Sequence, residues 1–182
     1  MLDAVDTRRH IRPRARPVML AAVLRGLQST AGLSDRQWSE FLARVALTPA
    51  DLDDETALVP LESGLRAFDL LVHVSGRPDL ALHYARAFPI GGTGALGFAL
   101  VSARTVREAL QTLARFMPLV TSMRISRYTE DATQRGLAWQ YAVAPTVPRF
   151  HLAAWGVALV IGRLTPALPH GWKPLAVEFE EP

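Results

Sequence analysis

Cysteine is absent from this 182-residue sequence. Its absence excludes disulfide bonds, thiolate metal sites and a cysteine nucleophile, and it favours a reducing cytoplasm. Long apolar runs are missing too, since the longest, LAAWGVALVIG at 152–162, is shorter than the roughly 20 residues that span a bilayer. The first residues hold no apolar stretch of the kind that makes a signal peptide. We therefore expect a cytoplasmic protein with no membrane partner.

Net charge is scarce outside the N-terminus. The formal charge of the chain is +3, and residues 1–17 carry it, because their arginines outnumber Asp3 and Asp6. The neutral remainder is unlike a nucleic-acid-binding domain. Residues 1–17 are predicted to form a flexible basic arm, with contact to DNA phosphate or to an acidic partner as the alternative. Residues 18–182 have the length of one domain and show no internal linker.

Catalytic and metal-binding motifs are also missing. The sequence contains neither G-x-S-x-G nor H-E-x-x-H, and its five histidines are scattered. His73 and His83 lie on separate predicted helices and could approach each other at a metal or haem site, but a lone, partly buried histidine is more often structural. The sequence thus predicts no enzyme, no catalytic residue, no metal and no cofactor.

Helical periodicity dominates the first two thirds of the chain. Pro17 opens an apolar helical pattern that stops at Gly32, and Ser34 is placed to cap the next helix. Thr105 and Glu108 have the spacing of a capping box ahead of an amphipathic stripe. The predicted helices cover, in order, residues 18–32, 34–45, 61–76, 79–88 and 105–117.

The pattern then changes to one of strands. Apolar residues alternate in RGLAWQYAV and more weakly in MRISRYTE, which predicts a hairpin. Residues 150–164 return to a helix that is apolar almost all round, so it is expected inside the core or at a subunit interface. The closing PLAVEF is strand-like. The expected fold is α+β, an N-terminal helical layer packed against a small antiparallel or mixed sheet formed by the C-terminal half.

The hexapeptide GTGALG at 92–97 matches the dinucleotide fingerprint G-x-G-x-x-G. That fingerprint needs a buried strand before it and a ribose-binding acid about 20 residues further on. Pro89 cannot donate to a central ladder, the chain upstream is helical, and the later region is FMPLV. The glycines are instead predicted to let the backbone turn and pack closely ahead of the next helix. No nucleotide cofactor is expected.

Three stretches together resemble a known family. They are ALTPADLDDETALVPLESGLRAFDLLVHVSGRPDLALHYARAF, then GGTGALGFALVSARTVREALQTLARFMPLV, then LVIGRLT followed by PLAVEFEEP. In this order they are similar to the N-terminal effector domain of AraC/XylS-type transcriptional regulators. The subgroup is that of the ornithine-utilisation regulator, whose domain is often labelled arabinose-binding-like. The resemblance covers most of residues 18–181, and its specificity lies in the order of the motifs.

The resemblance implies a ligand-sensing regulatory domain that binds a small-molecule effector and transmits the binding to dimerisation and DNA binding. It further implies a homodimer, and contact with DNA only through a C-terminal helix-turn-helix domain that this chain does not include. The chain departs from the family pattern at Asp53-Asp54, where Asp-Pro is usual, and at Gly76-Arg77-Pro78-Asp79, where Gly-Asp is usual. A ligand-free oligomerisation domain is the alternative function.

Aromatic residues of the C-terminal half are the candidates for a binding pocket between helices and sheet. They could line an apolar cavity or simply fill the core. Arginines lie near the same elements, and one that faces inward would clamp a carboxylate; the three in question are Arg115, Arg124 and Arg149. The predicted ligand-binding residues are Phe116, Arg124, Trp139, Tyr141, Phe150 and Trp155. Trp155 and Leu159 are the candidates for a dimer interface.

Overall fold

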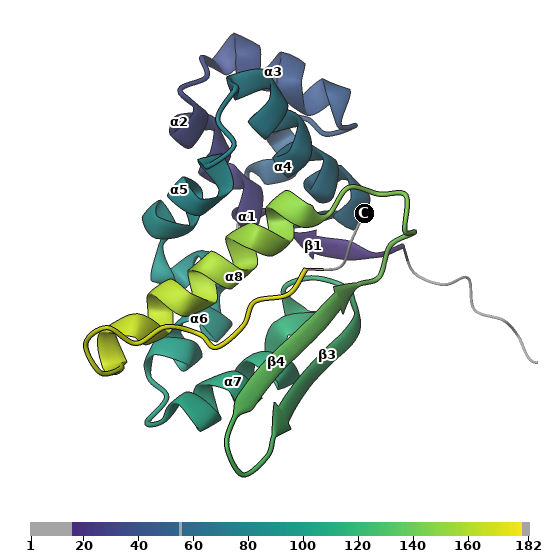
Figure 1. The fold of residues 1–182 in the computed structure, drawn as a ribbon. Coiled ribbons are helices and arrows are strands. Elements are labelled where there is room, and N and C mark those ends of the chain that lie inside the picture. Colours follow the sequence, from purple (N-terminus) through teal and green to yellow (C-terminus); the bar gives the residue numbers. More distant parts are fainter. Residues whose placement is uncertain (1–15, 55, 180–182) are drawn as a thin grey trace, which may run out of the picture.

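The computed structural model of the chain describes residues 16–54 and 56–179. A cluster of helices makes up the N-terminal half, and a long hairpin lies between two helices in the C-terminal half (Figure 1). The predicted α+β class is confirmed. Most of the predicted basic arm, residues 1–15, lies outside the described residues, whereas the carbonyl of Pro17 accepts a hydrogen bond from Leu61 N at 2.9 Å.

Helices provide most of the regular structure. They are α1 (Ala22–Arg25), α2 (Leu27–Ala31), α3 (Asp35–Arg44), α4 (Leu61–Ser75), α5 (Leu80–Ala87), α6 (Ala95–Val101), α7 (Val106–Phe116) and α8 (Phe150–Leu164). The strands form two antiparallel pairs, β1 (Val18–Leu20) with β2 (Leu58–Pro60), and β3 (Met123–Glu130) with β4 (Arg135–Tyr141). Helix α8 has the bounds that the sequence predicts.

Local capping signals account for the helices that the sequence placed well. The Ser34 hydroxyl accepts a hydrogen bond from Gln37 N at the start of α3, and the Thr105 hydroxyl accepts one from Glu108 N at the start of α7. Gly32 and Gly76 end α2 and α4 in the left-handed conformation, with φ of 70° and 62°. The hydroxyl groups accept hydrogen bonds from backbone N–H groups that have no partner within the helix, and the glycines adopt the left-handed conformation that ends a helix.

The first predicted helix is wrong at its start, because Val18–Leu20 is a strand. Its backbone pairs with β2, and Leu20 N also donates to the carbonyl of Val120 at 2.8 Å. These partners lie about 40 and 100 residues away, so a local periodicity could not reveal them. The helical pattern then breaks again at Gly26, where the ring of Tyr84 approaches too closely for a side chain.

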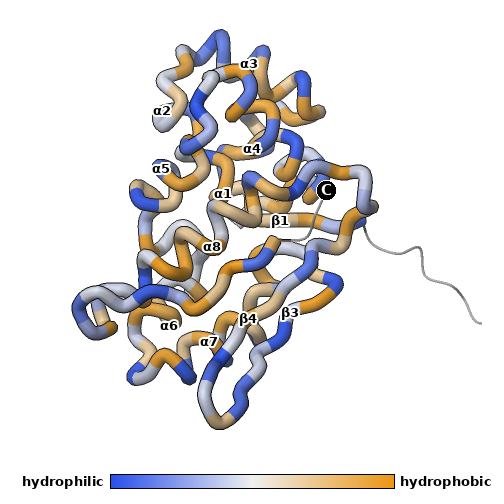
Figure 2. The backbone as a smooth tube through the Cα atoms, in the orientation of Figure 1, coloured by the Kyte–Doolittle hydropathy of each residue, from blue (hydrophilic) through white to orange (hydrophobic). Residues whose placement is uncertain are grey.

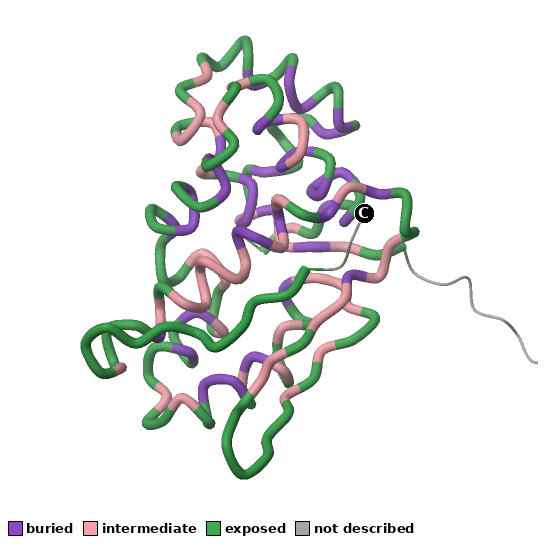
Figure 3. The backbone as a smooth tube through the Cα atoms, in the orientation of Figure 1, coloured by how far each residue is buried: buried purple, intermediate pink, exposed green. Residues whose placement is uncertain are grey.

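The closing strand is also wrong: residues 168–179 form no strand. This C-terminal segment runs alongside α8 and faces β4 (Figure 1), yet it makes no ladder with β4. Its apolar side chains are largely exposed, Leu175 most of all at 86 %. The segment is green over most of its length in Figure 3, in contrast to the buried centre of the helical half.

Two apolar cores hold the domain together. The larger includes Phe68 of α4, which is fully buried, and Leu152 and Trp155 of α8. The smaller lies between α6, α7 and the end of α8, and the inner face of the hairpin packs against it through Tyr128 and Leu137. Apolar segments of both halves converge on α8 (Figure 2). Helix α8 therefore connects the helical half to the hairpin.

By length and composition alone, the helical stretch Phe150–Ala167 is apolar enough to cross a membrane. The sequence estimate from residues 152–162 was too short, because α8 continues into a 3₁₀ turn at Thr165–Ala167. Only 28 % of the stretch is buried. The core helix of a soluble protein passes the same test, and Leu152 and Trp155 do lie in the core. Most of the other residues of α8 are half-buried, and several of them line a cavity.

Candidate functional site

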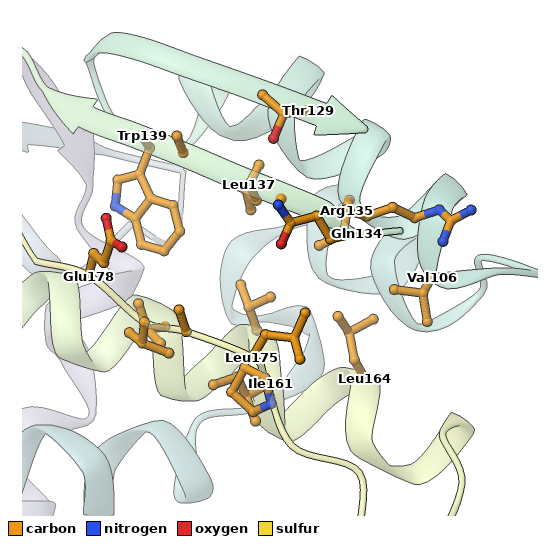
Figure 4. Close-up of a pocket in the computed structure, with 18 of the residues that line it drawn as sticks. Val106, Thr129, Gln134, Arg135, Leu137, Trp139, Ile161, Leu164, Leu175 and Glu178 are labelled. Carbon is orange, nitrogen blue, oxygen red and sulfur yellow. The ribbon is translucent and has the colours of Figure 1, made fainter. Parts of the chain in front are cut away.

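A cavity of about 1220 Å³ opens between α8, β4, the start of α7 and the C-terminal segment. Pockets for small molecules typically measure about 300–1,000 Å³, so this one is large enough for a metabolite. Its walls come from three parts of the sequence that only the fold brings together. In Figure 4 the strand lies on one side and α8, with the C-terminal segment, lies on the other.

The strand wall is an unpaired sheet edge. Asp131 N donates to the carbonyl of Gln134 at 3.0 Å, so these two residues form a hydrogen-bonded pair. Along an antiparallel hairpin, such pairs alternate with pairs whose backbone groups point away from the partner strand, and Leu137 and Trp139 belong to the second kind. The backbone groups of Leu137 and Trp139 therefore point away from β3. Within the described residues, β4 has no second strand neighbour. The cavity thus follows a row of backbone donors and acceptors.

The helix wall is apolar. Successive turns of α8 present Ala153, Val157, Val160, Ile161 and Leu164 to the cavity. In β4, the side chain of Leu137 points toward this wall (Figure 4). The spacing of the helix residues is the 3–4 residue period of one helix face, while the opposite face of α8 packs on α4 and α5. The all-round apolar character of α8 follows from these two environments.

One end of the cavity carries a compact charged cluster, which we call the Glu130 cluster: Arg107, Tyr128, Glu130 and Arg135. Arg107 donates to Glu130 Oε1 from Nε at 3.1 Å and from Nη2 at 2.6 Å. Arg135 Nε lies 2.9 Å from the same oxygen, and the Tyr128 hydroxyl donates to Oε2 at 2.8 Å. The Tyr128 hydroxyl, and after it Arg107, hold the pKa of Glu130 below its ordinary value. Glu130 is therefore ionised near neutral pH.

The other end holds Tyr141, Arg149, Phe150 and Glu178. Tyr141 is buried, and burial raises the pKa of its hydroxyl above the ordinary value, opposed by a hydrogen bond with Trp139. Arg149 is 9 % exposed and donates to the carbonyl of Pro145. The Glu178 carboxylate lies beside the Trp139 ring (Figure 4). The negative charge of Glu178 thus lies at the end opposite to the two arginines.

Of the six predicted ligand-binding residues, three line the large cavity and three do not. Trp139, Tyr141 and Phe150 line the cavity. Phe116 and Arg124 do not: Phe116 lies exposed with the Arg115 guanidinium 5.1 Å from its ring centre, and Arg124 donates to the carbonyl of Val143. Whether any of the six binds a ligand stays a prediction.

Trp155, the sixth of them, lies in the larger core. Its ring centre is 5.0 Å from that of Phe88, 5.8 Å from that of Phe68 and 6.0 Å from that of Tyr84. Trp155 is 6 % exposed, and Leu159 is half-buried against the same core. The Trp155 side chain is therefore not presented on the surface, whereas that of Leu159 is partly exposed. The homodimer and the place of both residues in its interface stay predictions.

A second cavity, of about 70 Å³, lies in the interior between β1, α6, α7 and α8. Thr121 and Trp155 line it, and within residues 16–54 and 56–179 their buried Oγ1 and Nε1 atoms make no hydrogen bond. The space suits ordered water rather than a metabolite. The large cavity is therefore the candidate functional site.

The sequence left open an approach of His73 to His83, but favoured structural roles for the histidines. His73 faces His151 of α8 rather than His83, with ring centres 6.3 Å apart, and Asp69 Oδ1 lies 3.2 Å from His151 Nδ1. His83 is exposed. In the part of the chain that the structure describes, no group of three or more His, Cys, Asp or Glu residues is placed to hold a metal ion.

Sequence reasoning missed Arg107 and Arg135. Arg107 lies at the second position of α7, and Arg135 lies at the first position of β4. Glu130 and Arg135 flank the hairpin turn at opposing positions, which gives a sequence clue to their contact. No local sequence pattern indicates that α7 approaches that turn.

A family model described as the arabinose-binding domain of AraC transcription regulator, N-terminal, matches residues 37–182. The matched range contains every residue that lines the large cavity. The family is that of a regulatory ligand-binding domain rather than of an enzyme. No curated protein matches the chain. The match does not address the ornithine-utilisation subgroup, which stays a prediction.

Proposed function

The chain belongs to the family of N-terminal arabinose-binding domains of AraC transcription regulators, and on this premise we propose that it is a ligand-sensing regulatory domain whose effector binds in the cavity between α8 and β4. The observation that carries the proposal is the cavity itself. It is large, it has an apolar helix on one side, and it has backbone and charged groups on the other. Such a combination of apolar walls and a few polar groups is typical of small-molecule sites.

The wall that is best suited to respond to the effector is the C-terminal segment. It borders the cavity through residues 172–179, has no ladder partner among the described residues and is largely exposed. A wall held by few contacts costs little free energy to move. An effector that contacts it in only one position therefore shifts the balance between positions. Dimerisation, DNA binding through a helix-turn-helix outside this chain and a cytoplasmic location belong to the same proposal.

The test is a variant that fills the cavity. Val157→Trp places a large side chain in the middle of the α8 wall, and Val74→Trp places the same side chain on an exposed position of α4. The fluorescent probe 8-anilinonaphthalene-1-sulfonate, which has an apolar body, should bind the wild type and the Val74→Trp variant. It should bind Val157→Trp at least tenfold more weakly, with the melting temperature preserved.

Hydrogen exchange then tests the sensing step. With the probe bound, the amides of residues 172–179 and of Leu137 and Trp139 should exchange more slowly than in the free protein. Equal probe binding by Val157→Trp and the wild type would contradict the cavity as the site. Unchanged exchange in residues 172–179 would contradict their response to binding.

A further inference from the structure

The chemistry of the cavity lining identifies a class of effector, and this step rests on the proposed function. We propose that the cavity selects an elongated molecule with an apolar body and one anionic head group, of the carboxylate class, rather than a sugar. The head lies at the Glu130 cluster and the body lies along α8. The family description names arabinose, but the residues of this chain favour a different ligand chemistry.

The head-group site is the pair of guanidinium groups, from Arg107 and Arg135, at one end of the cavity. Arg107 and Arg135 approach the same oxygen of Glu130, so two guanidinium groups share one carboxylate. Arg135 uses Nε for this contact, and within residues 16–54 and 56–179 its two terminal nitrogens make no hydrogen bond. A guanidinium is the side chain that binds a second carboxylate most readily, through two parallel N–H donors.

Each end of the cavity also holds other charged residues. Glu178 lies at the opposite end (Figure 4), together with Arg149, which donates to the carbonyl of Pro145. Asp131 is engaged within the hairpin turn, where its Oδ1 accepts from the backbone nitrogens of Thr133 and Gln134 at 2.7 and 2.9 Å. The side chains of Arg107 and Arg135 are 53 % and 42 % exposed, so a head group reaches them from the mouth of the cavity.

The middle of the cavity suits an apolar body. The side chains that surround it are aliphatic or aromatic and come from both walls and from the C-terminal segment: Leu137, Trp139, Val157, Val160, Ile161, Leu164 and Leu175. A sugar hydroxyl placed against such side chains loses its hydrogen bonds to water without replacement, which is unfavourable. An alkyl or aryl chain gains free energy in the same place, in proportion to the apolar area removed from water.

The experiment compares ligands of one shape and different charge. Octanoate, octan-1-ol, octylamine and L-arabinose are titrated into the protein by calorimetry at neutral pH, with the fluorescence of Trp139 as a second readout. A Trp139→Phe variant assigns the fluorescence change. Octanoate should bind at least tenfold more tightly than octan-1-ol, because one charge-assisted hydrogen bond contributes about that factor. Octylamine and L-arabinose should bind more weakly than either.

Matched variants then locate the head group. Arg135→Gln and Arg107→Gln should each weaken octanoate by about tenfold and leave octan-1-ol unchanged. Arg127→Gln is the control, because Arg127 lies opposite Ala138 on the other face of the same hairpin and does not line the cavity. It should leave both affinities unchanged.

The failures of the two proposals differ. If octan-1-ol, octylamine or L-arabinose binds as tightly as octanoate and changes the Trp139 fluorescence, the carboxylate inference is wrong and the cavity remains the effector site. Equal octanoate binding by Arg135→Gln, Arg107→Gln and the wild type likewise contradicts the inference alone. If none of the four ligands binds or alters Trp139, both proposals are contradicted.

Discussion

The backbone of Gly97 lies directly against the carbonyl oxygen of Ile90: a Cβ atom at Gly97 would be 1.8 Å from that oxygen. The neighbouring Gly94 takes a φ of 61°, which favours glycine. These two positions of the G-x-G-x-x-G pattern therefore bring α6 onto the 3₁₀ turn at Ile90–Thr93. The elements before α6 are α5 and this 3₁₀ turn, not a strand, and the contact of Gly97 with Ile90 confirms the expected close packing.

Replacing Gly97 by alanine should destabilise the protein. The added methyl group meets backbone rather than a movable side chain, so α6 must shift at a cost of about 2–3 kcal/mol in the free energy of unfolding. Gly162→Ala on α8 is the control, because an added Cβ meets nothing within 4 Å and alanine favours a helix by up to about 1 kcal/mol. Urea denaturation measures both. Equal stability of Gly97→Ala and the wild type would contradict the packing account.

Short-range signals explain most of what the sequence predicted correctly. The caps at Ser34 and Thr105, the left-handed glycines and the hairpin all depend on residues within a few positions of one another. The start of the first predicted helix was wrong, because Val18–Leu20 forms its hydrogen bonds with β2 and with residues near Val120, which lie far along the sequence. Apolar residues that favour a helix locally were fixed as a strand by these distant partners.

The candidate site was only partly predictable for the same reason. Trp139 and Tyr141 share one strand face, so their position on one wall followed from the period of two. The opposite wall required knowing which face of α8 lies on the core, and an all-round apolar helix carries no such information. The alternation in residues 174–179 is that of a strand, but a strand also needs a neighbour, and that segment has none in the structure.

Trp155→Ala should lower the free energy of unfolding by about 3–5 kcal/mol, because it removes a large ring from the aromatic cluster with Phe68, Tyr84 and Phe88. Trp172→Ala, in the exposed C-terminal segment, should cost less than about 1 kcal/mol. Chemical denaturation measures the stability of both variants, and light scattering measures their oligomeric state. A Trp155→Ala protein that keeps its stability and turns from dimer to monomer would restore the interface interpretation.

Asp131 should make the hairpin turn sensitive to acid. Hydrogen bonds from the backbone nitrogens of Thr133 and Gln134 lower the pKa of Asp131 from 3.8 to about 2. A carboxylate whose pKa is depressed in the folded state stabilises that state above its ordinary pKa, and the effect is lost as the pH falls toward 2. Asp131→Ala should therefore melt below the wild type at pH 6, and the gap should narrow as the pH falls from 4 to 2.

Asp53→Ala provides the comparison for this titration, because within the described residues the Asp53 carboxylate accepts no hydrogen bond. Its melting temperature should follow that of the wild type at every pH. A gap between Asp131→Ala and the wild type that stays constant from pH 6 to pH 2 would show that Asp131 acts through something other than its charge.

The most direct measurement of the central claim is a set of nuclear Overhauser contacts between bound octanoate and methyl-labelled protein. If the effector occupies the cavity, the alkyl protons of octanoate should show contacts to Val157, Val160 and Ile161 and to the ring of Trp139. Contacts confined to exposed apolar residues elsewhere, such as Val74 or Leu119, would contradict it.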